Sequence, residues 1–257
     1  MRAATTYIAV IVMTAAVFAS TARGQPTDNG HVAFFAAPGN EIVGLTTKLV
    51  VPARLAEPSH ANWTLFLWPG LQPSRDHANY WPIGNGVLQS VLTWGSSCAP
   101  EKKPKGSWWI SAQYVNTLGH YMGYQWCSGG LIIDVNPKDT LLIDMSLFRS
   151  IWTQTILNQV TKESTIFRAS LADQAQAIAR FEIEPIGDAI SPEVVFLETT
   201  IRFAHPHPDN CRLREYGPDD VVTEPLIVAE GQSCYVEKIT LKPPTRPRPA
   251  KSLLRPR

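Results

Sequence analysis

In the stretch AIARFEIEPI, residues 177–186, apolar and mostly polar side chains alternate. Successive side chains of a β-strand point to opposite faces, so this pattern predicts a strand with one apolar and one charged face. The apolar face holds Ala177, Ala179, Phe181 and Ile183. The charged face holds Arg180, Glu182 and Glu184, with Ile178 as its apolar exception. A helix starting at Leu171 is the alternative, because Leu171, Ala175 and Ile178 fall at helical spacing.

Two carboxylates on one strand face repel each other, which raises the pKa of each and favours a neighbouring hydrogen-bond donor. Glu182 and Glu184 therefore fit acid–base chemistry, although alternating charges more often form the solvated face of a strand. For Glu182 a salt bridge to Arg180 is the simpler interpretation. A site is favoured by Gln89, the one amide in an otherwise apolar strand pattern at residues 86–95. The alternative for Gln89 is a half-buried amide that a neighbouring residue satisfies.

The rest of the chain continues this pattern of short, glycine- and proline-bounded segments. Residues 41–52 alternate and end at a proline, residues 62–69 are apolar and aromatic, and residues 107–115 form a further strand pattern. The NPKD segment at residues 136–139 is a strong turn signal between two more strands. About a dozen short strands and no strong long helix predict an all-β fold, most simply two stacked antiparallel sheets.

The two ends differ in composition from the middle. Residues 1–24 contain an apolar run too short to span a bilayer, followed by small residues, so we expect a signal peptide and a secreted, extracellular protein. Residues 25–241 are expected to form one domain. Residues 242–257 hold six basic and no acidic residues among many prolines, and are expected to be a disordered tail. Without this tail 17 basic residues stand against 22 acidic ones, which argues against a nucleic-acid partner.

Export makes the four cysteines candidates for two disulfides. Proximity in the sequence favours Cys98 with Cys127 and Cys211 with Cys234. Zinc is the poorer interpretation because no two cysteines have CxxC spacing, and a metal site at His205 and His207 lacks a third ligand in pattern. Asn62 begins an N-W-T glycosylation sequon. We expect neither a metal nor a cofactor.

The order of elements resembles the eqolisins, the secreted glutamic peptidases of fungi. In that family a Gln in an I-L-Q-T-G strand and a Glu closing an A-E-[WF]-I-[VI]-E strand form the catalytic pair. VLQS at residues 87–90 resembles the first motif, and ARFEIE at residues 179–184 resembles the second. The resemblance extends over about residues 42–203 and implies an antiparallel β-sandwich of the concanavalin A-like jelly-roll type. It also implies that Gln89 and Glu184 are catalytic.

The chain departs from the family at several positions near this pair. Pro69 stands where the family has an Asp, and Gln113 lies near the place of a buried acid. Arg180 replaces an acid, and Glu182 replaces an aliphatic residue. These departures favour a competing interpretation, a secreted sandwich without catalytic activity that binds glycan or cell-wall material on its concave face.

The resemblance implies an acid endopeptidase in which Glu184 activates water and Gln89 donates to the oxyanion. Its partner would be an unfolded protein or peptide, and the protein is expected to be a monomer. Six further residues are predicted to bind substrate on the concave face, although the tryptophans among them fit a sandwich core equally well. They are Trp68, Trp94, Trp109, Gln113, Trp152 and Glu182.

Overall fold

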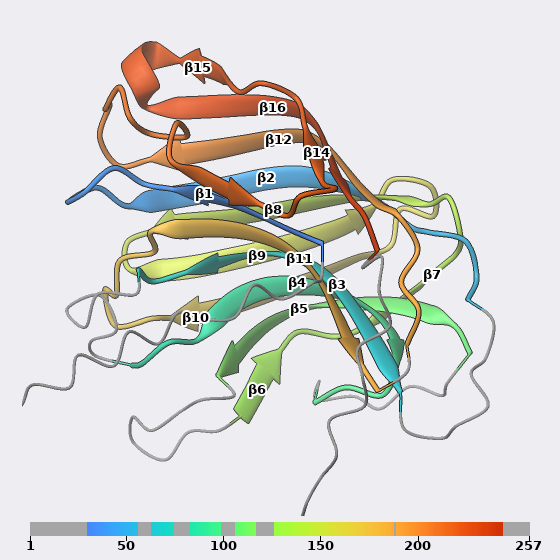
Figure 1. Ribbon diagram of the computed structural model, residues 1–257. Coiled ribbons are helices and arrows are strands. Elements are labelled where there is room, and N and C mark those ends of the chain that lie inside the picture. The colour runs from blue at the N-terminus through green and yellow to red at the C-terminus, as the bar shows by residue number, and fades with distance from the viewer. Residues whose placement is uncertain are drawn as a thin grey trace, which may run out of the picture.

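The computed structural model describes residues 30–55, 63–74, 83–98, 106–116, 126–187 and 189–243. The predicted signal peptide, most of the predicted tail and the sequon residue Asn62 lie outside these ranges. The described residues form two antiparallel sheets of eight strands each, stacked as a sandwich (Figure 1). The predicted all-β sandwich is therefore confirmed.

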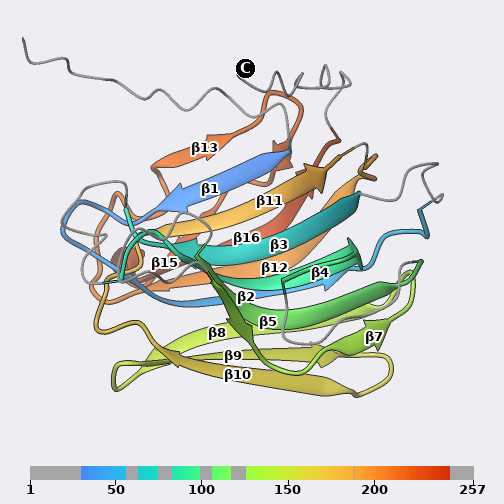
Figure 2. The ribbon, with the colours of Figure 1, turned by 90° about the horizontal axis from the view of Figure 1, so that it is seen from below.

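The first sheet has the strand order β13-β1-β11-β3-β4-β5-β6, and β7 also pairs with β5 (Figure 2). Its strands are β1 (His31–Phe35), β3 (Thr64–Gln72), β4 (Val87–Gly95), β5 (Trp108–Asn116), β6 (Trp126–Gly129), β7 (Ile133–Val135), β11 (Ile178–Ile186) and β13 (Arg214–Tyr216). Neighbours in this order are often far apart in the sequence, so the sheet is assembled by long-range pairing.

The second sheet has the order β10-β9-β8-β2-β12-β16-β14, and β15 also pairs with β16. Its strands are β2 (Ile42–Val50), β8 (Thr140–Phe148), β9 (Ile151–Asn158), β10 (Ser164–Ser170), β12 (Val194–Phe203), β14 (Val221–Val222), β15 (Leu226–Val228) and β16 (Ser233–Leu241). A short 3₁₀ turn, η2 (Ala229–Gly231), joins the last two. No helix in the described ranges has the length and apolar character needed to cross a membrane.

The stretch AIARFEIEPI forms strand β11 from Ile178 onward, and its apolar face lies in the core between the sheets. The ring of Phe181 is fully buried, 6.3 Å from that of Phe34 on β1 and 5.0 Å from that of Phe196 on β12 of the opposite sheet. The alternative helix from Leu171 is wrong. Ala172 and Asp173 have φ angles of 50° and 59°, which turn the chain instead of continuing a right-handed helix.

Both predicted disulfides are present. Cys98, just after β4, pairs with Cys127 on β6, and Cys211 pairs with Cys234 on β16. Cys211 and Cys234 are each 1% exposed and belong to the core. The second disulfide therefore fastens the segment that leads into β13 of the first sheet to a strand of the second sheet.

Candidate functional site

The first sheet has one face in the core and one face directed away from the second sheet, which we call the outer face. On β4 the core face carries Leu88 and Leu92, so Gln89 between them points outward. On β11 the core face carries Ala179, Phe181 and Ile183, so the charged residues also point outward. The outer face includes His31, Trp68, Gln89, Trp109, Gln113, Arg180, Glu182 and Glu184. Gln89 and Glu184 thus share one face, as predicted.

Strand register defines which outer-face residues are neighbours across the sheet. Arg180 lies opposite Gly70, Gly70 opposite Gln89, and Gln89 opposite Gln113. Because glycine has no side chain, no side chain stands between Arg180 and Gln89 in this row. A Cβ atom added at Gly70 would lie 3.1 Å from the Cβ of Gln89. The first row of the site therefore consists of an amide and a guanidinium on either side of a glycine.

The two carboxylates occupy the next two outward positions of β11. Glu182 lies opposite Trp68 on one side and His31 on the other, and Glu184 lies opposite Phe66. The Trp68 indole Nε1 donates a hydrogen bond of 3.2 Å to Glu184 Oε2. The predicted salt bridge of Glu182 is present, with 3.6 Å between its Oε2 and Arg180 Nε.

Burial governs the electrostatics of these carboxylates. Burial raises the pKa of Glu182 above its ordinary value, and the negative charge of Glu184 adds to this rise. The nearby Arg180 and His31 lower the same pKa, each by less than burial raises it. Burial also raises the pKa of Glu184, and the hydrogen bond from Trp68 opposes the rise. Both groups therefore hold a proton at a higher pH than exposed glutamates do.

Strand register places the backbone positions of Gln89 and Glu184 well apart on the outer face. Their strands, β4 and β11, are separated by β3, and the residues are offset by four positions along the strand direction. At normal strand spacings this corresponds to about 16 Å between their Cα atoms. Glu182 is two residues out of row from Gln89, about 12 Å by the same reckoning. The order of motifs along the chain could not show this offset, because the register between strands is set by their pairing in three dimensions.

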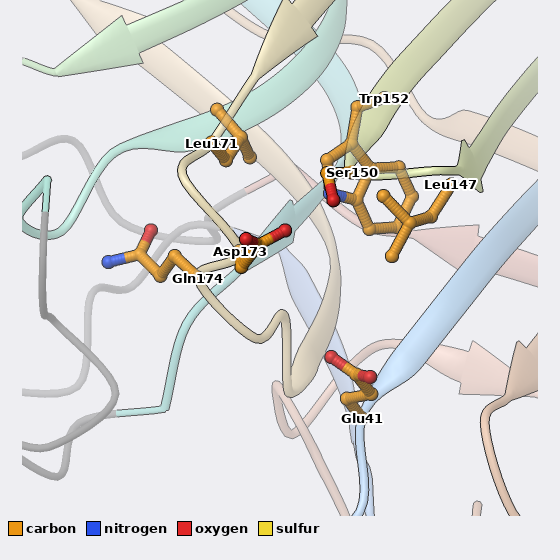
Figure 3. Close-up of a pocket in the computed structure, with 7 residues that line it drawn as sticks. All are labelled: Glu41, Leu147, Ser150, Trp152, Leu171, Asp173 and Gln174. Atoms are coloured by element: carbon orange, nitrogen blue, oxygen red, sulfur yellow. The ribbon is translucent and has the colours of Figure 1, made fainter.

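The predicted aromatic substrate site is only partly formed. Trp94 and Trp152 lie in the core between the sheets, each 2% exposed, so their prediction as surface subsites is wrong. Trp152 instead lines a cavity of about 130 Å³ beside Leu147 and Leu171, with Glu41 and Asp173 across it (Figure 3). Trp109 is on the outer face but has no exposed surface, and its Nε1 donates to the Gly95 carbonyl at 3.3 Å. Of the four predicted tryptophans, Trp68 is the one that hydrogen-bonds to a carboxylate of the site, that of Glu184.

Gln113 and Pro69 also differ from their expected roles. Gln113 is 1% exposed, and its Nε2 donates a hydrogen bond of 2.6 Å to Ser111 Oγ. It therefore packs beside Gln89 without being accessible to a substrate. Pro69 alternates with Trp68 and Gly70 on β3 and therefore faces the core. The position compared with the family's Asp is thus not an outer-face position in this chain.

Sequence reasoning missed two components of the site, Gly70 and His31. His31 begins β1 opposite Glu182, and its Nε2 lies 3.7 Å from Glu215 Oε1 on β13. In the sequence, His31 was visible only as a polar residue, and Gly70 only as a small residue, beside an apolar strand pattern. Within the described ranges, no three His, Cys, Asp or Glu side chains gather as a metal site would require.

No family model matches the sequence, and no curated protein is similar to it in sequence. Solved structures that are similar over most of the chain include the following two. Scytalido-glutamic peptidase with a peptide-based transition-state analog is 13% identical, with a TM-score of 0.44 over 82% of this chain and 98% of that one. SCP-B, an eqolisin in complex with the tripeptide Ala-Ile-His, is 13% identical, with a TM-score of 0.43 over 81% of this chain and 96% of that one. At these values the similarity does not by itself assign an activity.

Proposed function

We propose that the outer face of the first sheet binds an unfolded peptide chain and hydrolyses it at acidic pH, outside the cell. The observation that carries this proposal is one arrangement of groups. Two half-buried carboxylates with raised pKa values, Glu182 and Glu184, share a face with the Gln89 amide and with Arg180, whose Nε lies 3.6 Å from Glu182 Oε2 and has no hydrogen-bond partner among the described residues. Acid–base groups beside hydrogen-bond donors are what acyl hydrolysis by water requires.

The register suggests how the work is divided among these residues. A substrate carbonyl placed over Gly70 would lie between Gln89 and Arg180, which both donate hydrogen bonds and would stabilise the oxyanion. Glu182 is the nearer carboxylate in register and would act as the base that activates water, then return the proton to the leaving amine. Glu184, held by Trp68, would raise the pKa of Glu182 by its negative charge.

This assignment differs from the pair implied by the resemblance, in which Glu184 is the base, and kinetics distinguish the two. With a quenched fluorescent peptide, Glu182→Gln and Gln89→Ala should each lower kcat/KM by on the order of 10² or more. Glu184→Gln should retain most activity and move the acidic limb of the pH profile to lower pH, because a charge that raises the pKa of Glu182 is gone. Loss of activity in Glu184→Gln but not in Glu182→Gln would return the base to Glu184.

A second function, binding without catalysis, is favoured by the register offset between Gln89 and Glu184. Without a water shared by these two groups, the outer face would still present an aromatic ring, carboxylates and hydrogen-bond donors to a glycan or an extended peptide. Retention of the wild-type protein on a glycan or cell-wall matrix, together with no peptide cleavage between pH 3 and 7, would support this function over the first.

A further inference from the structure

A second cavity, of about 340 Å³, is lined by residues of β5, β6 and β10. Strand β5 of the first sheet contacts β10, the edge strand of the second sheet, and both strands can be followed in Figures 1 and 2. Its apolar lining comes from Ile83, Phe167, Ala169 and Leu171. Tyr114 and Asn116 also line it, and they alternate with Gln113 on β5, so they point to the opposite side of the sheet from the outer face. The cavity is therefore separate from the proposed peptide site, and its volume is within the range of small-ligand pockets.

The inner wall of this cavity holds polar atoms that no described residue satisfies. Asn116 is 2% exposed and its Nδ2 donates to the Ile83 carbonyl at 3.3 Å, but its buried Oδ1 accepts no hydrogen bond. The buried Tyr114 hydroxyl likewise has no acceptor for its proton among the described residues. Burial raises the pKa of Tyr114 to about 12, and a contact with the Gly86 backbone partly offsets this. A polar atom that is buried without a partner destabilises the folded protein, so a ligand that hydrogen-bonds to either atom gains binding free energy.

We propose that this cavity binds a small apolar molecule that carries a hydroxyl group at its buried end. A hydroxyl can donate to Asn116 Oδ1 and accept from the Tyr114 O–H at the same time, whereas an ether or carbonyl can only accept. The volume corresponds to about ten water molecules at roughly 30 Å³ each, so it suits a ligand of on the order of ten to fifteen non-hydrogen atoms. Arg168 lines the cavity from β10, and its side chain is on the solvent side of that strand with Ile166, so its charge favours an anionic group only at the ligand's outer end.

The test compares two probes that differ only in the buried hydroxyl, 10-hydroxydecanoate and decanoate, by isothermal titration calorimetry on the full chain. The hydroxy acid should bind about tenfold more tightly, the ratio expected for one well-placed buried hydrogen bond. In Asn116→Leu this preference should disappear. Equal affinity of the wild-type protein for the two probes, or no binding of either, would overturn the proposal.

Two substitutions on strand β10 locate the binding. Ala169→Trp fills the cavity and should abolish binding of 10-hydroxydecanoate. Ile166→Trp introduces the same side chain at a position that is 48% exposed and points out of the sandwich, so binding should persist. Near-ultraviolet circular dichroism checks that both variants fold, and undiminished binding by folded Ala169→Trp would show that the probe occupies another place.

Discussion

Truncation of Phe181 tests whether the ring cluster between the sheets holds strand β11 in its position. Phe181 has no exposed surface and packs edge-on against Phe34 of its own sheet and Phe196 of the opposite sheet. At about 25 cal/mol per Å² over roughly 150 Å² of buried surface, Phe181→Ala should lose about 4 kcal/mol of unfolding free energy. This value lies inside the range of about 3–5 kcal/mol found for such truncations.

The assay is urea unfolding at neutral pH with the disulfides intact, followed by circular dichroism and linear extrapolation. Phe148→Ala is the matched control, because Phe148 is 70% exposed and its ring contacts only Arg149, 5.1 Å away, among the described aromatic and cationic pairs. The control should cost less than about 1 kcal/mol. If Phe181→Ala cost no more than Phe148→Ala, the claim that this ring joins the two sheets would be wrong.

Two further predictions concern the site's carboxylates and the core disulfide. Burial raises the folded-state pKa of Glu182 and Glu184 above the ordinary 4.5, so the folded protein binds protons at these groups more tightly than the unfolded chain does. The free energy of unfolding should therefore rise as the pH is lowered from above the raised pKa values towards 4.5. Glu182→Gln and Glu184→Gln should each flatten this rise in urea unfolding measured against pH, and identical slopes in variants and wild type would contradict the account. Removing the Cys211–Cys234 disulfide, which closes a separation of 23 residues, should cost roughly 3 kcal/mol in the same unfolding assay, and a cost near zero would show that this link does not constrain the unfolded chain.

The fold was accessible from the sequence because its determinants are local. The alternation around Phe181 allows only one face of β11 to be buried. The predicted turn at residues 136–139 lies between β7 and β8 in the structure. The disulfide partners were predictable for the same reason, because each cysteine pairs with its neighbour in the sequence and closes a short loop. Local patterns of this kind do not depend on how distant strands pair.

The site was less accessible because it depends on that pairing. Alternation predicts that Gln89 and Glu184 can share a face, but their offset of four residues follows from the register of β11 with β3 and of β3 with β4. Trp94 and Trp152 illustrate a second limit. A tryptophan in a strand has the same appearance in sequence whether its face is the core or the surface, and here both lie in the core.

Peptide hydrolysis is tested by mass spectrometry of a denatured protein incubated with this protein across pH 3 to 7. New peptide termini should form with the wild-type protein at acidic pH, and they should be lost in Glu182→Gln and in Gln89→Ala under conditions where both variants remain folded. Absence of new termini with folded wild-type protein at every pH in this range would contradict the claim that the outer face hydrolyses peptides.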